Sequence, residues 1–258
     1  TMPAYKPAMI KAPYAYAIKI ENFGAFAAKP KIEITYPNGA QTPTVAIIAP
    51  AGAVVHYTTD GTNPTLSSPT YTAPFTPTKT TLVKAQIFDN TKLPGKVAEV
   101  SARAYTWMPA VKTSGALQPG VAYKYFETKG KQNLAALPGL TPAVTGVTAD
   151  ISVAVKKRAS EFSLLFDGYL KIEKNGIYHF TTRSDDGSIL YIDDEEVVNN
   201  DGDHGSVEAA GKAALKKGYH KIRVAYYDGS GGNELTATIQ LENAEKNNLN
   251  SKLIWIKK

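Results

Sequence analysis

Short runs in which apolar and polar residues alternate, separated by Gly, Pro, Asn and Asp, occupy nearly the whole chain. Alternation with a period of two is typical of strands with one buried face, and the separating residues favour turns. Helical periodicity is weak, apart from "KQNLAALPG" at 131–139. The pattern therefore predicts an all-β protein, and the spacing of its turns is that of β-sandwiches.

The runs form two groups, which predicts two β-sandwich domains in series. Five expected strands of the first domain are "KIEITYPNGA", "TPTVAIIAP", "VVHYTTDG", "TLVKAQIFDN" and "KVAEVSARAYTW". In the second group, residues 169–183 predict a hairpin at Asn175-Gly176, where both residues tolerate positive φ, and 188–198 predict another at Asp193-Asp194.

The domain boundaries follow from a Pro- and Gly-containing stretch with little periodicity near the middle of the chain. We expect a first sandwich over 30–105, a linker over 106–118 and a second sandwich over 119–258. Residues 1–29 are rich in Pro and Tyr, and we expect an extended segment or an edge strand there.

Composition narrows the possible functions. The 258 residues include no cysteine, which excludes disulfides and thiolate metal sites. The net charge of +6 is spread along the chain, so nucleic acid is not an expected partner. No run approaches 18 apolar residues, so no membrane span is expected. The first residues lack the pattern of a secretory signal, and we expect a segment cut from a longer protein.

Catalytic motifs are missing from the chain. Neither an HExxH zinc motif nor a GxSxG nucleophile elbow occurs. Residues 205–213 depart from a phosphate loop, with five residues between the glycines, and 201–212 depart from an EF-hand loop, with lysine at its twelfth position. The acidic turn at 193–196 offers carboxylates, but surface turns are commonly acidic because they are solvated. Catalysis by this chain is not expected.

The residues alone allow two interpretations of "SDDG" at 184–187. Adjacent side chains in an extended strand point to opposite faces, so Asp185 and Asp186 share an ion only if the backbone between them leaves the extended form. Equally, Ser-Asp-Asp-Gly is an ordinary turn before a strand. An ion site and a structural turn both remain open.

Residues 54–90 resemble the C-terminal module of chitobiases and β-hexosaminidases. The matching residues are Tyr57, Thr58, Asp60, Gly61, Pro64, Tyr71, Pro74, Thr81 and Ala85. The resemblance spans most of 30–105 and implies a small immunoglobulin-like sandwich. In that sandwich Gly61 supplies turn dihedrals and Asp60 bonds backbone N–H groups.

From about Pro119 to the end, the chain resembles the lectin-like module first described in anthrax protective antigen. Yeast flocculins, epithelial adhesins and many bacterial glycosidases carry this module. The resemblance rests on "GVAYKYFE", "FDGYLKIEKNGIYHFTTRSDDGSILYIDDEEVVNNDGDHG" and "KKGYHKIRVAYYDGSGGNEL". It implies a larger lectin-like sandwich of the protective-antigen type.

In the adhesin branch of that family, two adjacent aspartates joined by a cis peptide ligate one calcium ion, and a second loop adds a side-chain oxygen and carbonyls. The resemblance therefore implies a Ca²⁺ cofactor, with the metal ligands Asp185, Asp186, Asp228, Ser230 and Gly232 in this chain. The residues expected to contact carbohydrate are Asp185, Asp186, Asp203, His204 and Asn233.

Both resemblances point to one setting, because both modules are commonly appended to glycoside hydrolases. We expect a non-catalytic accessory region of a larger exported enzyme, periplasmic, cell-surface or secreted, acting on glycans in the manner of a β-N-acetylhexosaminidase. Its expected partners are a glycan and an upstream catalytic domain of the same polypeptide. Two alternatives remain: a purely structural spacer, and part of a surface adhesin.

Overall fold

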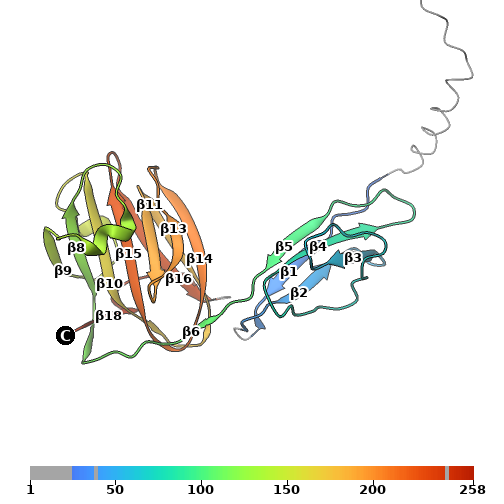
Figure 1. Cartoon of the computed structure of the whole chain (residues 1–258), viewed down its shortest axis with the longest axis horizontal. Helices are drawn as coiled ribbons and strands as arrows, with labels where there is room; N and C mark the ends of the chain where they lie inside the picture. Colours follow the sequence, from blue (N-terminus) through green and yellow to red (C-terminus); the bar gives the residue numbers. More distant parts are fainter. Residues whose placement is uncertain (1–24, 38–39, 242–243) are drawn as a thin grey trace, which may run out of the picture. The chain divides into compact units, whose positions relative to one another are not determined.

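The structure is a computed structural model that describes residues 25–37, 40–241 and 244–258. The chain divides into two compact units, with the main boundary between Ala104 and Tyr105 and with residues 38–41 grouped with the second unit. The regular secondary structure of both units is almost entirely strand, as the alternating pattern predicted (Figure 1). Within the described ranges, no helix is long and apolar enough to cross a membrane.

The first unit contains two small antiparallel sheets. They are formed by β1 (Lys31–Thr35) and β2 (Thr44–Ile48), and by β3 (Val54–Thr58), β4 (Thr81–Phe88) and β5 (Ala98–Ala102). Every strand expected from the sequence of this unit is present. Apolar side chains of both sheets meet in the core, where Ile47 lies in one cluster with Val55 and Ile87, and Val45 in another with Val83. This unit is therefore a small sandwich.

The turn after β3 has the expected architecture. The Oδ1 atom of Asp60 accepts hydrogen bonds from the backbone N–H and the hydroxyl of Thr62, at 3.0 and 2.6 Å. Gly61 has a φ of 84°, a conformation that favours glycine. Of the N-terminal segment expected over 1–29, residues 1–24 lie outside the described residues, and Phe26 forms an isolated bridge with Leu93.

The second unit is a larger sandwich of two sheets. One sheet has eight strands: β7 (Leu117–Pro119), β8 (Val121–Glu127), β9 (Val144–Thr148), β10 (Phe162–Ile172), β12 (Ser188–Ile192), β13 (Glu195–Asn200), β15 (Gly218–Asp228) and β18 (Ile254–Lys257). The other has five: β6 (Trp107–Met108), β11 (Gly176–Asp185), β14 (Val207–Leu215), β16 (Glu234–Leu241) and β17 (Asn247–Asn248).

The core of the second unit lies between these sheets. Phe166, Leu190 and Tyr226 of the eight-stranded sheet pack in one cluster with Phe180 and Leu235 of the five-stranded sheet. The eight-stranded sheet also carries a smaller core on its outer face. There the 3-10 helix η3 (Leu134–Gly139) lies against β15 (Figure 1). A second short 3-10 turn, η4 (Val153–Val155), stands between β9 and β10.

The hairpin predicted at Asn175-Gly176 is wrong. The strands on either side, β10 and β11, belong to different sheets, and the turn carries the chain from one layer to the other. Neither Asn175 nor Gly176 has a positive φ, so the turn geometry that would pair the two strands is not formed. The hairpin predicted at Asp193-Asp194 is confirmed: both residues have positive φ and β12 pairs with β13.

The stretch 106–118, which we expected to be a linker, contributes strands to the second unit. β6 pairs in parallel with β14 through Trp107 and Met108, and β7 pairs with β18. These strands are two and three residues long, too short for an alternating pattern to be read from the sequence.

Candidate functional site

The expected aspartates lie at one end of the second sandwich, where the chain crosses between the sheets three times, once in the loop from β13 to β14 that contains Asp203 and His204. Asp185 ends β11 in the five-stranded sheet, and three residues later β12 begins in the eight-stranded sheet. Asp228 ends β15, and the loop after it crosses back to β16. Because these crossings occur at the same end, residues more than 40 positions apart in sequence become neighbours. The Asp185–Asp186 peptide bond is cis.

Asp186 ties the two crossing loops together. Its Oδ1 accepts the backbone N–H of His204 at 3.1 Å, and its Oδ2 accepts that of Gly229 at 2.9 Å. The next residue, Gly187, has no room for a side chain, since a Cβ there would lie 2.5 Å from Cε1 of Tyr227. The glycine of the Ser-Asp-Asp-Gly segment is therefore required by packing.

Asp228 is the most unusual carboxylate of the site. It is fully buried, and neither of its oxygens has a hydrogen-bond partner. Burial and the charges of Asp186 and Asp185 raise the pKa of Asp228 to about 6. The positive charge of Lys156 partly opposes this rise, as does the backbone N–H of Glu161, which is near but does not reach hydrogen-bond geometry. An unpaired buried carboxylate is costly, because it gives up its water without compensation.

The glycine-rich loop that follows Asp228 approaches the aspartates through its backbone. A Cβ on Gly232 would lie 2.8 Å from Oδ2 of Asp185, and one on Gly229 would lie 3.6 Å from Oδ2 of Asp186. Gly231 has a φ of 92°, which favours glycine. The backbone of this loop therefore lies against the carboxylates, and Ser230 and Gly232, whose carbonyl oxygens are the expected ligands, belong to it.

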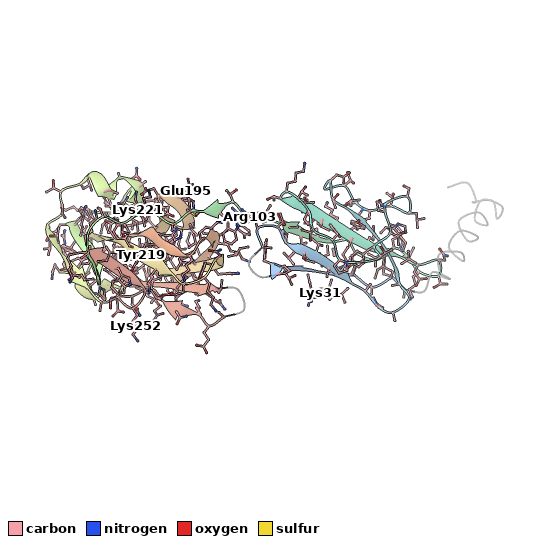
Figure 2. All side chains as sticks on the ribbon, turned by 90° about the horizontal axis from the view of Figure 1, so that it is seen from below. Lys31, Arg103, Glu195, Tyr219, Lys221 and Lys252 are labelled. Carbon is pink, nitrogen blue, oxygen red and sulfur yellow. The ribbon has the colours of Figure 1, made fainter. Side chains whose placement is uncertain are left out.

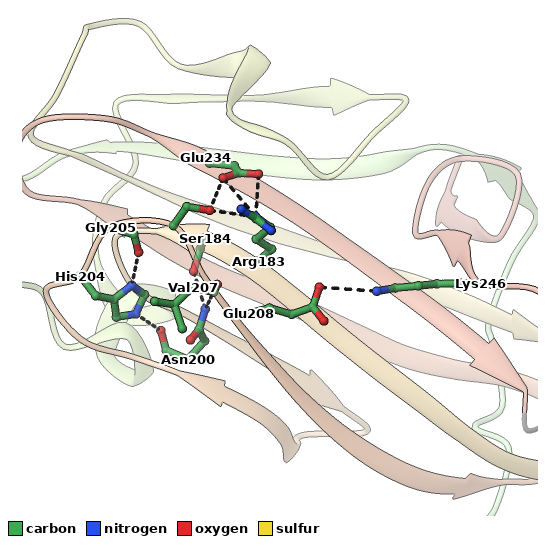
Figure 3. A network of polar contacts seen from close by, with 10 residues as sticks. Arg183, Ser184, Asn200, His204, Gly205, Val207, Glu208, Glu234 and Lys246 are labelled. Carbon is green, nitrogen blue, oxygen red and sulfur yellow. Dashed lines mark hydrogen bonds and ion pairs between the residues drawn. The ribbon is translucent and has the colours of Figure 1, made fainter.

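The structure brings Asp203 and His204 to the same end, but it uses their polar atoms within the protein. Oδ1 of Asp203 accepts a hydrogen bond from the Tyr227 hydroxyl at 2.5 Å. The two ring nitrogens of His204 face the carbonyl oxygens of Gly205 and Asn200, at 2.8 and 3.0 Å (Figure 3). Burial lowers the pKa of His204, but these carbonyls and the nearby aspartates outweigh it, so the net shift is upward.

Asn233 also reaches the site, and both ends of its amide are engaged. The ammonium of Lys156 donates to Oδ1, and Nδ2 donates to the Ala159 carbonyl at 2.8 Å. Asn233 therefore joins the glycine-rich loop to the loop after η4. Lys156 was not among the residues expected at the site, because it lies 77 positions from Asn233 and no motif marks it.

Two tyrosines close the site from the core side. Tyr226 and Tyr227 are fully buried. The Tyr226 hydroxyl donates to the Asp185 carbonyl at 2.5 Å, and burial together with the aspartates raises its pKa. A buried chain of hydrogen bonds anchors both ends of the aspartate segment: Asn200 donates to the Ser184 hydroxyl (Figure 3), which in turn bonds the Ser188 hydroxyl.

The residues present fit a hard cation. Carboxylate and carbonyl oxygens are the ligands that Ca²⁺ prefers, and it takes six to eight of them. A cation beside Asp228 would supply the partner that this buried carboxylate lacks. Within the described residues, no three His, Asp or Glu side chains converge closely enough to hold a metal ion by themselves. A complete ligand set therefore needs oxygens from the glycine-rich loop as well.

Fold and site define this chain as a tandem of two β-sandwich modules, the second with an acidic loop site. The chain belongs to the PA14 domain family, which matches residues 117–251, just over half of its length. Residues 33–99 match the chitobiase/beta-hexosaminidase C-terminal domain. PA14 is the protective-antigen-type lectin-like module, so both family resemblances expected from the sequence are confirmed.

Several solved structures resemble the second domain. The PA14 domain of the MpAFP antifreeze protein is 20% identical, with a TM-score of 0.48, over 57% of this chain and 95% of that one. The PA14 sugar-binding domain of an RTX adhesin is 14% identical, with a TM-score of 0.46, over 54% and 99%. A subtype-switched epithelial adhesin A domain from Candida glabrata, in complex with β-lactose, is 13% identical, with a TM-score of 0.47, over 60% and 95%. No curated protein matches the chain.

Proposed function

We propose that the second domain binds carbohydrate through a calcium ion held at the clustered aspartates. The observation that carries this proposal is the buried carboxylate of Asp228. Its oxygens have no hydrogen-bond partner, and the carboxylates of Asp185 and Asp186 are close to it. The proposed ligands are the side chains of Asp185, Asp186 and Asp228 and the backbone oxygens of Ser230 and Gly232. When bound, calcium would offer coordination positions to sugar hydroxyls.

The surrounding residues have supporting roles in this proposal. Asp186 fixes the two loops through its bonds to the His204 and Gly229 N–H groups. Asp203, His204 and Asn233 line the site. Both polar atoms of the His204 and Asn233 side chains are bonded within the protein, so these two residues position the loops, whereas Asp203 is exposed and only its Oδ1 is bonded. All three contact the sugar mainly through their outward surfaces.

For the whole chain we propose a non-catalytic accessory role in a larger exported enzyme that degrades glycans. Family membership of both domains supports this, because such modules are commonly appended to glycoside hydrolases. The first sandwich would then act as a spacer beside an upstream catalytic domain. Turnover of a chromogenic glycoside by this chain alone would overturn the non-catalytic assignment.

The ion site is tested by thermal unfolding in EDTA and across a calcium series. An ion bound only by the folded state stabilises by about 2.7 kcal/mol at a hundredfold excess over Kd, which raises Tm by roughly 5–10 °C in a domain of this size. Asp185→Asn should lose most of this shift. Asp150→Asn, an exposed aspartate of the same domain, should keep it and serves as the matched control.

Retention on immobilised glycans tests the carbohydrate step separately. Retention that needs calcium and disappears in Asp185→Asn supports the full proposal. A calcium shift without any glycan retention would favour the structural spacer, in which the ion only stabilises the loops. No shift at millimolar calcium would remove the ion site and leave the aspartates as a structural turn.

A further inference from the structure

The eight-stranded sheet has a groove on its outer face, on the part that η3 does not cover. Side chains alternate along the strands, so Phe166 and Leu170 of β10 enter the core while Asp167 and Tyr169 face outward. A hollow of about 300 Å³ lies over this face. A second hollow of about 120 Å³ lies beside η3. Asp194 and Arg223 line both, so the two hollows adjoin, and together they are called the groove here.

The floor of the groove is open at Ala122, which pairs with the outward-facing Asp167 and has a small side chain. Gly168, which also lines the larger hollow, has a different role. A Cβ there would point toward the core, on the side of Phe166 and Leu170, and would lie 2.3 Å from Cγ2 of Ile254. This glycine therefore lets β18 approach β10 closely.

The charged side chains of the groove are paired across neighbouring elements. Nε of Arg223 donates to Oδ1 of Asp167 at 2.8 Å, and Nζ of Lys221 donates to Oδ2 of Asp194 at 2.8 Å. The bond to Asp167 uses one of the five N–H donors of the guanidinium, and each carboxylate oxygen has more than one acceptor position. A third cation, Lys257, lines the larger hollow and donates to the Ser114 hydroxyl at 3.1 Å. The groove therefore presents donors and acceptors, with two of its three cations paired to carboxylates.

An aromatic ring stands at each end of this polar strip. Tyr169 lines the larger hollow and Tyr191 the smaller one, and both are half-buried, with part of the side chain accessible. Burial raises the pKa of Tyr191, so its hydroxyl stays protonated in the neutral pH range. Each tyrosine thus supplies an apolar face and a hydroxyl to an occupant.

We propose that this groove is a second carbohydrate-binding site, which takes a segment of a neutral oligosaccharide and needs no ion. The apolar faces of successive sugar rings would pack on Tyr169 and Tyr191, and their hydroxyls would bond the Asp167–Arg223 and Asp194–Lys221 pairs. An anionic chain fits less well, because it must compete with the carboxylates already bound to Arg223 and Lys221 and meets only Lys257 outside an ion pair. The site shares no residue with the aspartate cluster and stands independently of it.

Oligosaccharide binding in EDTA tests the groove by itself, because EDTA removes the calcium that the aspartate cluster needs to bind sugar. The probes are hexasaccharides of β-1,4-linked glucose, N-acetylglucosamine, mannose and xylose, titrated into the full chain by calorimetry. We expect at least one to bind in EDTA and to bind Asp185→Asn equally well. Tyr169→Ala should weaken this binding by roughly tenfold, the effect of losing one aromatic packing contact.

Lys221→Ala provides a second variant, because this exposed side chain can be removed without opening the core. It should weaken binding by about threefold, a typical cost of one partly solvated hydrogen bond. Lys252→Ala is the matched control, an exposed lysine outside the groove that Figure 2 labels together with Lys221. Equal Tm values across the variants exclude unfolding as the cause of lost binding.

Three results would overturn the groove proposal: no binding of any hexasaccharide in EDTA, unchanged binding in both Tyr169→Ala and Lys221→Ala, or tighter binding of a hexamer of galacturonate than of every neutral hexamer. A calcium shift that persists in any of these cases leaves the aspartate site standing. Ion-independent glycan binding without a calcium shift would instead support the groove alone.

Discussion

At the residue scale, Lys156 places a positive charge beside the proposed cation site. Its ammonium donates to Asn233, and its charge partly opposes the rise in the pKa of Asp228. This charge partly compensates the buried carboxylate, and it also opposes any cation that binds the same carboxylates.

We therefore expect Lys156→Met to bind calcium more tightly. Loss of a unit charge in partly solvated surroundings is worth about 1 kcal/mol, or roughly a fivefold lower Kd. Isothermal titration of calcium measures this directly. Lys157→Met, which removes an exposed lysine from the adjacent position, is the control and should leave Kd unchanged. Equal Kd values for the two variants would show that Lys156 does not act on the ion.

His220 is a buried residue whose protonation should make stability depend on pH. Its Nδ1 faces the Asp193 carboxylate at 2.6 Å and its Nε2 faces the Lys216 carbonyl at 2.8 Å, so both nitrogens meet acceptors. Burial lowers the pKa of His220, but the bonds to Asp193 and Lys216 outweigh it, and the net shift is upward. The structure therefore favours the imidazolium.

A raised folded-state pKa gives a definite sign. The stabilisation from protonated His220 is fully present below the unfolded-state pKa of about 6.5 and is lost as pH rises through the higher folded-state value. We expect Tm of the second domain to fall over this interval, and His220→Gln to flatten the fall. The pKa of His204 is raised too, so His204→Gln must be measured alongside. A Tm profile of His220→Gln parallel to that of the wild type would refute this role.

At the element scale, η3 protects part of the outer face of the eight-stranded sheet. Leu137 is fully buried against this face, whereas Leu140, at the end of the same 3-10 helix, is 46% exposed. Leu137→Ala should therefore destabilise the second domain by about 2–4 kcal/mol, and Leu140→Ala by less than about 1 kcal/mol. Urea unfolding followed by fluorescence separates the two. Similar losses would mean that η3 does not pack on the sheet in solution.

The strands were predictable from the sequence, but their partners were not. Alternation along β4 indicated a strand because its odd-numbered residues are all buried. By contrast, Asn175-Gly176 has the composition of a hairpin turn yet joins two sheets, since Leu170 and Tyr178 on either side both enter the core between the layers. The residues of a turn do not by themselves determine which sheet the next strand joins.

The aspartates were recognisable from Ser-Asp-Asp-Gly and the glycine-rich loop, whereas their environment was not. Nothing near Lys156 in sequence indicates that its ammonium reaches Asn233. The buried, unpaired state of Asp228 depends on the packing of β15 and β10, where Asp228 lies opposite Phe162. Such features follow from tertiary contacts, which a single sequence does not specify.

At the scale of the whole molecule, each hydrophobic core draws its residues from one unit only. The clusters around Val55 and Val83 contain residues of the first unit alone, and those around Phe166 and Leu165 contain residues of the second alone. Each unit therefore has what a domain needs to fold by itself. Two-state unfolding is not expected of the intact chain.

This arrangement predicts that calcium acts on one of two separable transitions. A fragment of residues 105–258 should fold and show the same calcium-induced rise in Tm as the second domain of the intact chain, because every proposed ligand lies within it. The fragment 1–104 should unfold at the same temperature in EDTA and in calcium. Differential scanning calorimetry of both fragments and the whole chain gives the comparison. A calcium shift in the 1–104 fragment, or its loss from 105–258, would place the ion elsewhere than at the clustered aspartates.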